Sequence, residues 1–325
     1  MWTQAVHPFT SAISCQNTMY RSFFHLTRNP FDLSPDPACF VSTPRHDEAL
    51  ATLYYGVRQH KGFIVVTGEV GTGKTLLLRC LLQLLEKSHD IAFSYVFNGR
   101  LGAEDFLRYI LADLGFDTKD KNKSDLLLTF TAFLTDRGAK GLTTLLIVDE
   151  AHDLSEELLE EIRLLTNIET TKDKLLQVLL IGQPELEAKL DSMGLRQLKQ
   201  RIALRARLEQ LSPSETMTYI SQRLEMAGAN LQNDPIFSPE AVEAVYRHSN
   251  GIPRLINTLC ENALLSSYAM QSPTVTPEII DQVAEEFRLD GAATRARVDF
   301  NLSRPEKSRT PLEITTLLRN ADSTK

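Results

Sequence analysis

The stretch GEVGTGKT, residues 68–75, follows directly after the apolar run FIVV. The pattern G-x-x-x-x-G-K-[ST] between a strand and a helix is typical of a loop that binds nucleotide phosphates. Glycines let successive backbone N–H groups turn toward the phosphates, and the positive end of the following helix adds to the attraction. We expect every residue of the loop to contribute to binding: Gly68, Glu69, Val70, Gly71, Thr72, Gly73, Lys74 and Thr75.

Two adjacent acids, Asp149 and Glu150, end a second apolar run, LLIVDE. In the expected chemistry, Lys74 reaches the β- and γ-phosphates of ATP, while Thr75 and Asp149 hold Mg²⁺, Asp149 through water. Glu150 then orients or deprotonates the attacking water. Because the two motifs supply groups for the phosphates, the metal and the water, they predict hydrolysis of ATP with Mg²⁺ rather than binding alone.

Short apolar strands alternate with amphipathic helices around both motifs. Strands are predicted at 63–67, 92–97, 144–149 and 175–181, and helices at about 43–60, 74–88, 104–114, 124–137 and 155–168. Continuous apolar strands between helices indicate an α/β fold with a parallel sheet that is covered on both faces. In RIALRARL, residues 201–208, every second residue is apolar, which predicts a half-buried fifth strand.

The pattern changes to helices alone after about residue 210. Helix-start signals at Ser212, Ser238 and Thr276 are each followed directly by proline. Asn250-Gly251 ends one helix and Pro253 begins the next, so a bundle of four helices is predicted.

These patterns divide the chain into four parts. We predict a partly irregular lead-in segment at 1–40, an α/β nucleotide-binding domain at 41–209, a small helical lid domain at 210–290 and a flexible tail at 291–325. Within the lead-in, FFHLTRNPFDLSPDP suggests a loop pinned on a surface, and the tail has room for one short helix near 311–319.

The composition is ordinary for a globular protein. The net charge of −7 argues against a chain that coats nucleic acid, although a local basic patch remains compatible with it. The four cysteines form no CxxC pair, which favours free thiols in a reducing compartment. No run approaches the roughly 18 apolar residues of a membrane span, and the opening lacks the pattern of a secretory signal. We expect a cytoplasmic protein that a partner recruits to the inner membrane, without direct insertion.

The letters DEAH at 149–152 invite a helicase interpretation. A helicase needs a second, similar α/β domain that supplies arginines across a cleft, whereas a small helical bundle follows the fifth strand here. We therefore interpret His152 as the start of the next helix.

Residues 20–290 resemble the AAA+ ATPases, and within them the ExeA/GspA-like group of the general secretion pathway. Many NTPases share GFIVVTGEVGTGKTLLLRCLL and LLIVDEAHDLS, whereas LLTNIET, IGQPEL and NGIPRLIN are more discriminating. Transposition regulators of the TnsC/TniB kind and Orc/Cdc6-type initiators look like cousins. The resemblance implies a P-loop NTPase with a five-stranded parallel sheet, followed by an all-helical lid.

The resemblance also implies roles for further residues. Gln183 matches sensor 1, which touches the γ-phosphate or the lytic water, and Arg254 in GIPR matches sensor 2. Asn98 stands where the family often restrains the catalytic glutamate. Arg201 stands where AAA+ proteins usually place the arginine finger that serves a neighbouring subunit, with Arg196 as the alternative. A finger in trans implies a homo-oligomer, as a ring or a filament.

The resemblance favours one process for such an ATPase, the assembly or remodelling of a protein partner in secretion or envelope biogenesis. Longer secretion ATPases of this type carry a membrane span and a peptidoglycan-binding region, and neither is found before Lys325, so we expect action through a separate membrane protein.

Two alternative functions are also compatible with the sequence. A DNA-linked transposition ATPase would use the basic stretch Arg196, Lys199, Arg201, Arg205 and Arg207 against phosphates, although no helix-turn-helix signature or interleaved aromatic residues accompany it. A nucleotide-gated scaffold would assemble with ATP and hydrolyse it slowly.

Overall fold

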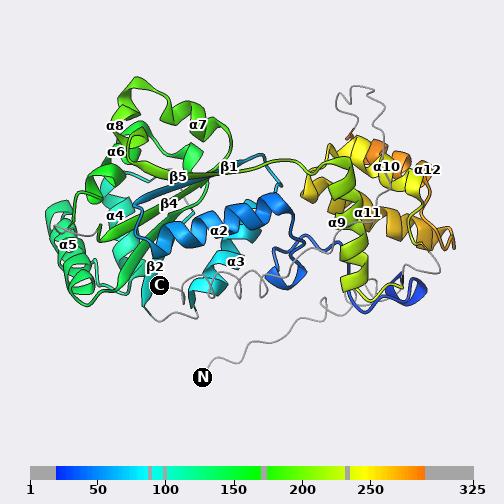
Figure 1. Cartoon of the computed structure of the whole chain (residues 1–325), viewed down its shortest axis with the longest axis horizontal. Helices are drawn as coiled ribbons and strands as arrows, with labels where there is room; N and C mark the ends of the chain where they lie inside the picture. The colour runs from blue at the N-terminus through cyan, green and yellow to red at the C-terminus, as the bar shows by residue number, and fades with distance from the viewer. Residues whose placement is uncertain (1–19, 87–89, 98–100, 170–173, 231–234, 290–325) are drawn as a thin grey trace. The chain divides into compact units, whose positions relative to one another are not determined.

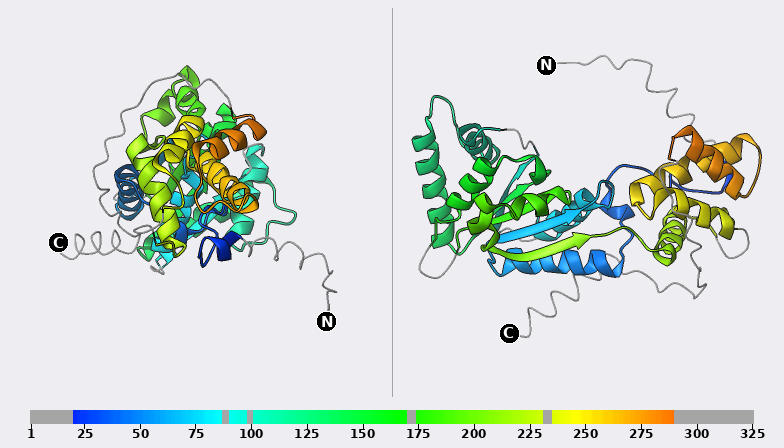
Figure 2. Two further views of the ribbon diagram at one scale, coloured as in Figure 1. Left: turned by 90° about the vertical axis from the view of Figure 1, so that its right-hand side faces the viewer. Right: turned by 90° about the horizontal axis from the view of Figure 1, so that it is seen from above.

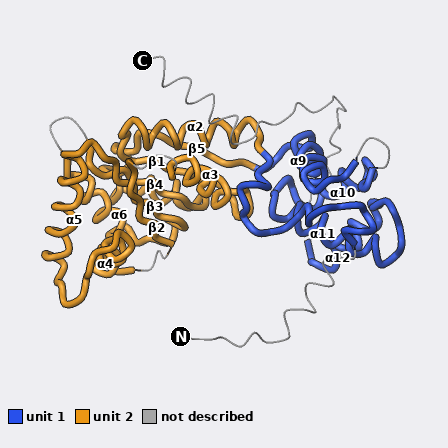
Figure 3. Tube along the Cα trace, turned by 90° about the horizontal axis from the view of Figure 1, so that it is seen from below, with its two compact units in different colours: residues 1–41, 210–308 blue, residues 42–209, 309–325 orange. Residues whose placement is uncertain are grey.

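The computed structural model describes residues 20–86, 90–97, 101–169, 174–230 and 235–289. The chain divides into two compact units, the first formed by residues 1–41 and 210–308 and the second by residues 42–209 and 309–325 (Figure 3). The predictions for the tail, for its short helix near 311–319 and for Asn98 lie outside the described residues.

The second unit is built on a five-stranded, all-parallel sheet (Figure 1). Its strand order is β2-β3-β4-β1-β5 (Figure 3). Its strands are β1 (Phe63–Gly68), β2 (Ile91–Val96), β3 (Thr143–Val148), β4 (Leu176–Gly182) and β5 (Ile202–Leu208). Every residue of the three inner strands is buried, whereas β5 alternates between half-buried and exposed residues until Leu208. The predicted α/β fold, including its half-buried fifth strand, is confirmed.

Helices cover the faces of this sheet, and three of those described begin at a side-chain cap. They are α2 (Pro44–Arg58), α3 (Lys74–Glu86), α4 (Ala103–Asp113), α5 (Lys123–Ala139), α6 (Glu156–Leu165) and the short α7 (Glu185–Leu190) and α8 (Arg196–Lys199). Thr43 caps α2, and Asn122 and Ser155 cap α5 and α6. The helix α2 runs beside β5 (Figure 2). Gly56 allows this close approach, because a Cβ there would meet the side chains of Ile64 and Leu204. The two short helices were not predicted, because four to six residues show too little periodicity.

Four helices form the predicted bundle in the other unit: α9 (Pro213–Met226), α10 (Pro239–Ser249), α11 (Pro253–Ala269) and α12 (Pro277–Glu286). The Ser212 capping box with Glu215 is present, and Ser238 caps α10. Thr276 precedes α12 without a side-chain cap hydrogen bond, so this start depends on proline and packing. Asn250 ends α10 in a left-handed conformation.

The described part of the predicted lead-in differs from expectation, because residues 20–41 help to form the core of the helical unit. Tyr20 and Phe31 are fully buried, and Phe24 is nearly so. Arg223 of α9 donates to the backbone carbonyls of Pro30, Asp32 and Cys39. These three residues lie about 190 positions before Arg223 in the sequence. The local pattern of prolines and aromatic residues could not show this long-range packing.

Within the described ranges, no helix is long and apolar enough to cross a membrane. The cysteines in those ranges, Cys39, Cys80 and Cys260, are free thiols, as expected.

Candidate functional site

The glycine-rich loop joins β1 to α3 at the carboxyl end of the sheet, where open α/β sheets place their ligands. Gly68 lies so close to β5 that a Cβ would stand 2.7 Å from Leu208 O and 2.8 Å from Thr72 Oγ1. Gly71 and Gly73 have positive φ angles of 83° and 96°, which only glycine adopts without cost. This backbone curls into the cradle that phosphate oxygens require.

The other loop residues divide into exposed and buried ones. Glu69, Val70 and Thr75 are exposed, with Thr75 in the first turn of α3. Thr72 is fully buried and its Oγ1 donates to Glu69 O at 2.8 Å, which stiffens the turn. His46 of α2 lies against the loop from outside, with Nε2 3.3 Å from Thr72 O.

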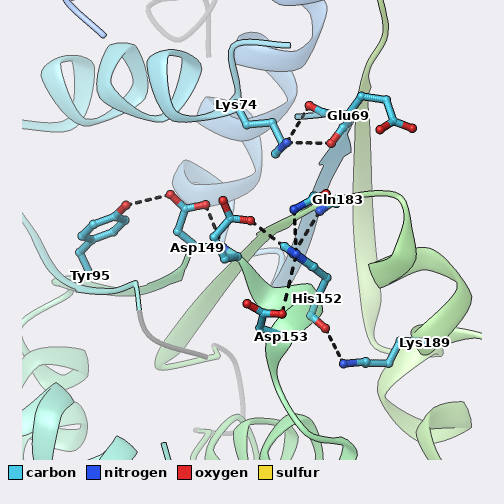
Figure 4. A network of polar contacts seen from close by, with 10 residues as sticks. Glu69, Lys74, Tyr95, Asp149, His152, Asp153, Gln183 and Lys189 are labelled. Carbon is cyan, nitrogen blue, oxygen red and sulfur yellow. Dashed lines mark hydrogen bonds and ion pairs between the residues drawn. The ribbon is translucent and has the colours of Figure 1, made fainter. Parts of the chain in front are cut away.

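Lys74 is buried at the base of the loop, where Nζ donates to Gly68 O at 2.7 Å and Glu69 O at 2.9 Å (Figure 4). Burial lowers the pKa of Lys74, while the negative charges of Glu150 and Asp149 oppose that change. The ammonium group therefore lies within the electrostatic field of both acids.

Asp149 follows β3 and is almost fully buried. Its Oδ1 accepts from the backbone N–H of Glu150 at 2.9 Å, and its Oδ2 accepts from the Tyr95 hydroxyl at 2.8 Å (Figure 4). Burial and the charge of Asp149 raise the pKa of Tyr95, so the phenol stays a donor. Tyr95 was not identified from the sequence, because only the pairing of β2 with β3 brings it to Asp149.

Glu150 stands at a sharp corner between β3 and the 3-10 helix η2 (Ala151–Asp153), with a left-handed backbone at φ 51° and ψ 38°. Such a conformation is uncommon for a non-glycine residue and clusters at functional sites. Its side chain is half exposed. The exposed carboxylate next to buried Asp149 fits the two different tasks expected of them.

Gln183 follows β4 at the same edge of the sheet, and its side chain contacts His152. The two side-chain Nε2 atoms are 2.9 Å apart, and His152 Nδ1 is 3.3 Å from Glu150 Oε2 (Figure 4). His152 does not start the next α-helix as expected, but is the middle residue of η2, and its imidazole contacts the two predicted site residues. The letters DEAH were the only sequence signal for this contact.

The predicted arginines belong to other elements than the residues of this cluster. Arg201 directly precedes β5, so it lies at the amino end of a parallel sheet whose glycine loop is at the carboxyl end. Its Nη1 is 3.2 Å from Thr166 Oγ1 and 3.5 Å from Arg163 O. Arg196 is exposed on α8, and Arg254 is exposed in the first turn of α11 in the helical unit.

Two of the five residues of the basic stretch are paired with acids of the same unit. Lys199 forms an ion pair with Asp191, and Arg205 forms one with Glu187. Because these charges are compensated locally, the stretch presents less positive charge than its sequence suggests.

The family described as AAA domain matches residues 57–190. General secretion pathway protein A of Aeromonas hydrophila is 43% identical over 270 residues, which are 82% of this chain and 48% of that protein. The chain belongs to the AAA+ ATPases, in the group of general secretion pathway protein A. It spans about half the length of this curated relative.

Solved structures agree on the fold of this AAA+ protein. Drosophila ORC bound to DNA is 21% identical with a TM-score of 0.60, and covers 89% of this chain and 70% of that chain. The Aeropyrum pernix ORC2 protein is 18% identical with a TM-score of 0.58, and the match covers 80% of this chain and 71% of the ORC2 chain. Cdc6p of Pyrobaculum aerophilum is 15% identical with a TM-score of 0.60, and the match covers 79% of this chain and 70% of the Cdc6p chain. At these identities the likeness supports the fold alone.

Proposed function

We propose that this AAA+ protein binds ATP with Mg²⁺ and hydrolyses it to drive assembly or remodelling of a partner complex. The observation that carries the proposal is the arrangement at the carboxyl end of the sheet. There the loop 68–75, Asp149, Glu150 and Gln183 follow β1, β3 and β4. Glycines, a buried ammonium group and a buried carboxylate beside an exposed one are the donor set that a triphosphate and Mg²⁺ fit.

The residues of the site have separate tasks in this proposal. The backbone of 68–73 and Lys74 hold the phosphates, while Thr75 and Asp149 hold the metal, which supplies charge neutralisation when bound. Glu150 orients the attacking water and takes its proton. Gln183 contacts the γ-phosphate or the water, and Arg254 reports the nucleotide state from the helical unit.

The partner is proposed to be a protein of secretion or envelope biogenesis, reached at the cytoplasmic side of the inner membrane. The likeness to general secretion pathway protein A over 82% of the chain supports this choice. A DNA-linked role has less support, since Lys199 and Arg205 are paired with acids. A scaffold with slow hydrolysis would need the residues that bind ATP, but it would not need Glu150 to activate water.

Steady-state ATP turnover tests the proposal, at fixed salt, with and without duplex DNA, over a range of protein concentrations. We expect turnover that rises with protein concentration and does not respond to DNA. Lys74→Ala should lose ATP affinity in calorimetry, and Glu150→Gln should bind ATP but turn it over about 10²–10⁴-fold more slowly. Strong stimulation by DNA would instead favour the transposition-type role, and wild-type turnover in Glu150→Gln would remove Glu150 as the base.

A further inference from the structure

His152 lies between two residues of the proposed site that come from different strands. Its side chain is 15% exposed, with Nδ1 3.3 Å from Glu150 Oε2 and Nε2 2.9 Å from Gln183 Nε2 (Figure 4). Glu150 follows β3 and Gln183 follows β4, so the imidazole bridges the ends of adjacent strands.

The partners of the imidazole decide which nitrogen carries the proton. A neutral imidazole has one donor and one acceptor, and a carboxylate only accepts. With the proton on Nδ1, the ring donates toward Glu150 and accepts from the Gln183 amide at Nε2. With the proton on Nε2 instead, Nδ1 would accept from the backbone N–H of Gln183 at 3.4 Å. The lone pair of Nδ1 would then face the Glu150 carboxylate. Charge therefore favours the first assignment, which is inferred from partners rather than from hydrogen positions.

The backbone around the imidazole is anchored from a third element. Lys189 of α7 donates through Nζ to His152 O at 2.5 Å and to Leu154 O at 2.6 Å. Asp153 is the remaining charged neighbour, with Oδ1 3.9 Å from His152 Nε2. Because Lys189 holds the backbone at His152 and at Leu154, the ring has less freedom to leave its two partners.

We propose that His152 is a positioning residue that couples Glu150 to Gln183, so that the proposed base and the proposed γ-phosphate contact act as one unit. This inference rests on the proposed ATP hydrolysis. In it, a shift of the Gln183 amide on contact with the nucleotide is passed through the imidazole and sets the direction of the Glu150 carboxylate.

A double-mutant cycle on the full chain tests the coupling. We expect His152→Ala and Gln183→Ala each to lower kcat for ATP about 10-fold or more, with little change in KM, and the double variant to be no slower than the slower single variant. Effects that multiply, or a His152→Ala enzyme within about twofold of wild-type kcat, would overturn the inference.

Folding and the proposed function are controlled separately. His60→Ala is the matched control, because His60 contacts Thr143 Oγ1 at 2.9 Å at the amino end of the same sheet, and it should keep wild-type kcat. If His152→Ala loses its thermal transition, His152→Asn replaces it in the cycle, since asparagine is too short to keep the Gln183 contact. A wild-type protein without turnover would overturn the proposed function itself, whereas normal wild-type turnover with additive variants would overturn only the coupling.

Discussion

At the scale of single residues, the carboxylate of Asp149 is oriented by donors that belong to the fold itself. Its two oxygens accept from Glu150 N and from the Tyr95 hydroxyl, so the direction of the carboxylate is set before any ligand is bound. Partners of this kind in the outer shell of a metal ligand tune its affinity for the metal. Tyr95 is therefore expected to act on the metal through Asp149.

Tyr95→Phe should weaken the response to Mg²⁺. The ring is kept, but Asp149 Oδ2 loses its hydroxyl donor, so the Mg²⁺ concentration for half-maximal turnover should rise about 10-fold. Titration of turnover with Mg²⁺ at saturating ATP measures this shift. Tyr109→Phe is a control, because its ring contacts Phe97 and it has no hydrogen bond to Asp149 among those described. An unchanged Mg²⁺ dependence would show that Tyr95 only fills space.

At the scale of elements, the β1–α3 turn is positioned by its neighbours as much as by its own glycines. The end of β5 lies against Gly68, and His46 of α2 contacts Thr72 O at 3.3 Å. Thr43 holds the other side of that imidazole, with Oγ1 2.8 Å from His46 Nδ1. The start of α2 and the end of β5 thus support the loop from outside the motif.

Gly68→Ala should damage the loop although it adds a single methyl group. The new Cβ would stand 2.7 Å from the backbone oxygen of Leu208, which cannot rotate away as a side chain could. We expect a loss of about 1–3 kcal/mol in the free energy of unfolding, and weaker ATP binding. Chemical denaturation and calorimetry measure the two effects. Gly102→Ala is the control, because nothing lies within 4 Å of a Cβ there, and equal stability of the two variants would contradict the expected clash.

At the scale of the whole molecule, an arginine finger at Arg201 would have to act on a neighbouring subunit. The residue lies at the amino end of β5, while the glycine loop of the same chain lies at the carboxyl end of β1. Within the chain it contacts Thr166 at the end of α6. An arginine that cannot reach its own site would stabilise the charge of phosphoryl transfer only in trans.

Mixing two inactive variants tests this arrangement. Arg201→Ala should lower turnover about 10³-fold or more, and Lys74→Ala should also be inactive. A mixture should regain part of the wild-type turnover, because one variant supplies an intact glycine loop and the other an intact arginine. Arg196→Ala is carried through the same mixing, since rescue with it instead would assign the finger to α8. No rescue with either arginine variant would count against a finger in trans.

The helical unit carries a half-buried acid, Glu261, that links stability to pH. The Tyr20 hydroxyl donates to Glu261 Oε1 at 2.7 Å, while Glu261 Oε2 is buried without a hydrogen-bond partner in the described part of the chain. Burial raises the pKa of Glu261. The folded protein therefore holds this proton more tightly than the unfolded chain, so the stabilisation is complete below the unfolded pKa and is lost as pH rises through the folded pKa.

Glu261→Gln should therefore raise the midpoint of thermal unfolding at pH 8 but not near pH 4. Glutamine keeps the carbonyl that accepts from Tyr20 and cannot ionise. Thermal scans at the two pH values measure the difference. Glu243→Gln, an exposed position of the same unit, serves as control and should change neither midpoint. An equal change for Glu261→Gln at both pH values would contradict the pKa argument.

The sequence by itself determined the features that depend on neighbouring residues. Strand and helix periodicities, the cap at Thr43, the glycine loop and the acids at 149–150 are local, because backbone hydrogen bonding and side-chain alternation act over a few residues. The tertiary structure alone decided the contacts between distant segments. Strand pairing brought Tyr95 to Asp149, and the ends of β3 and β4 brought His152 to Gln183. Packing of residues 20–41 into the helical unit likewise depended on Arg223 and on buried aromatic rings, which no local pattern encodes.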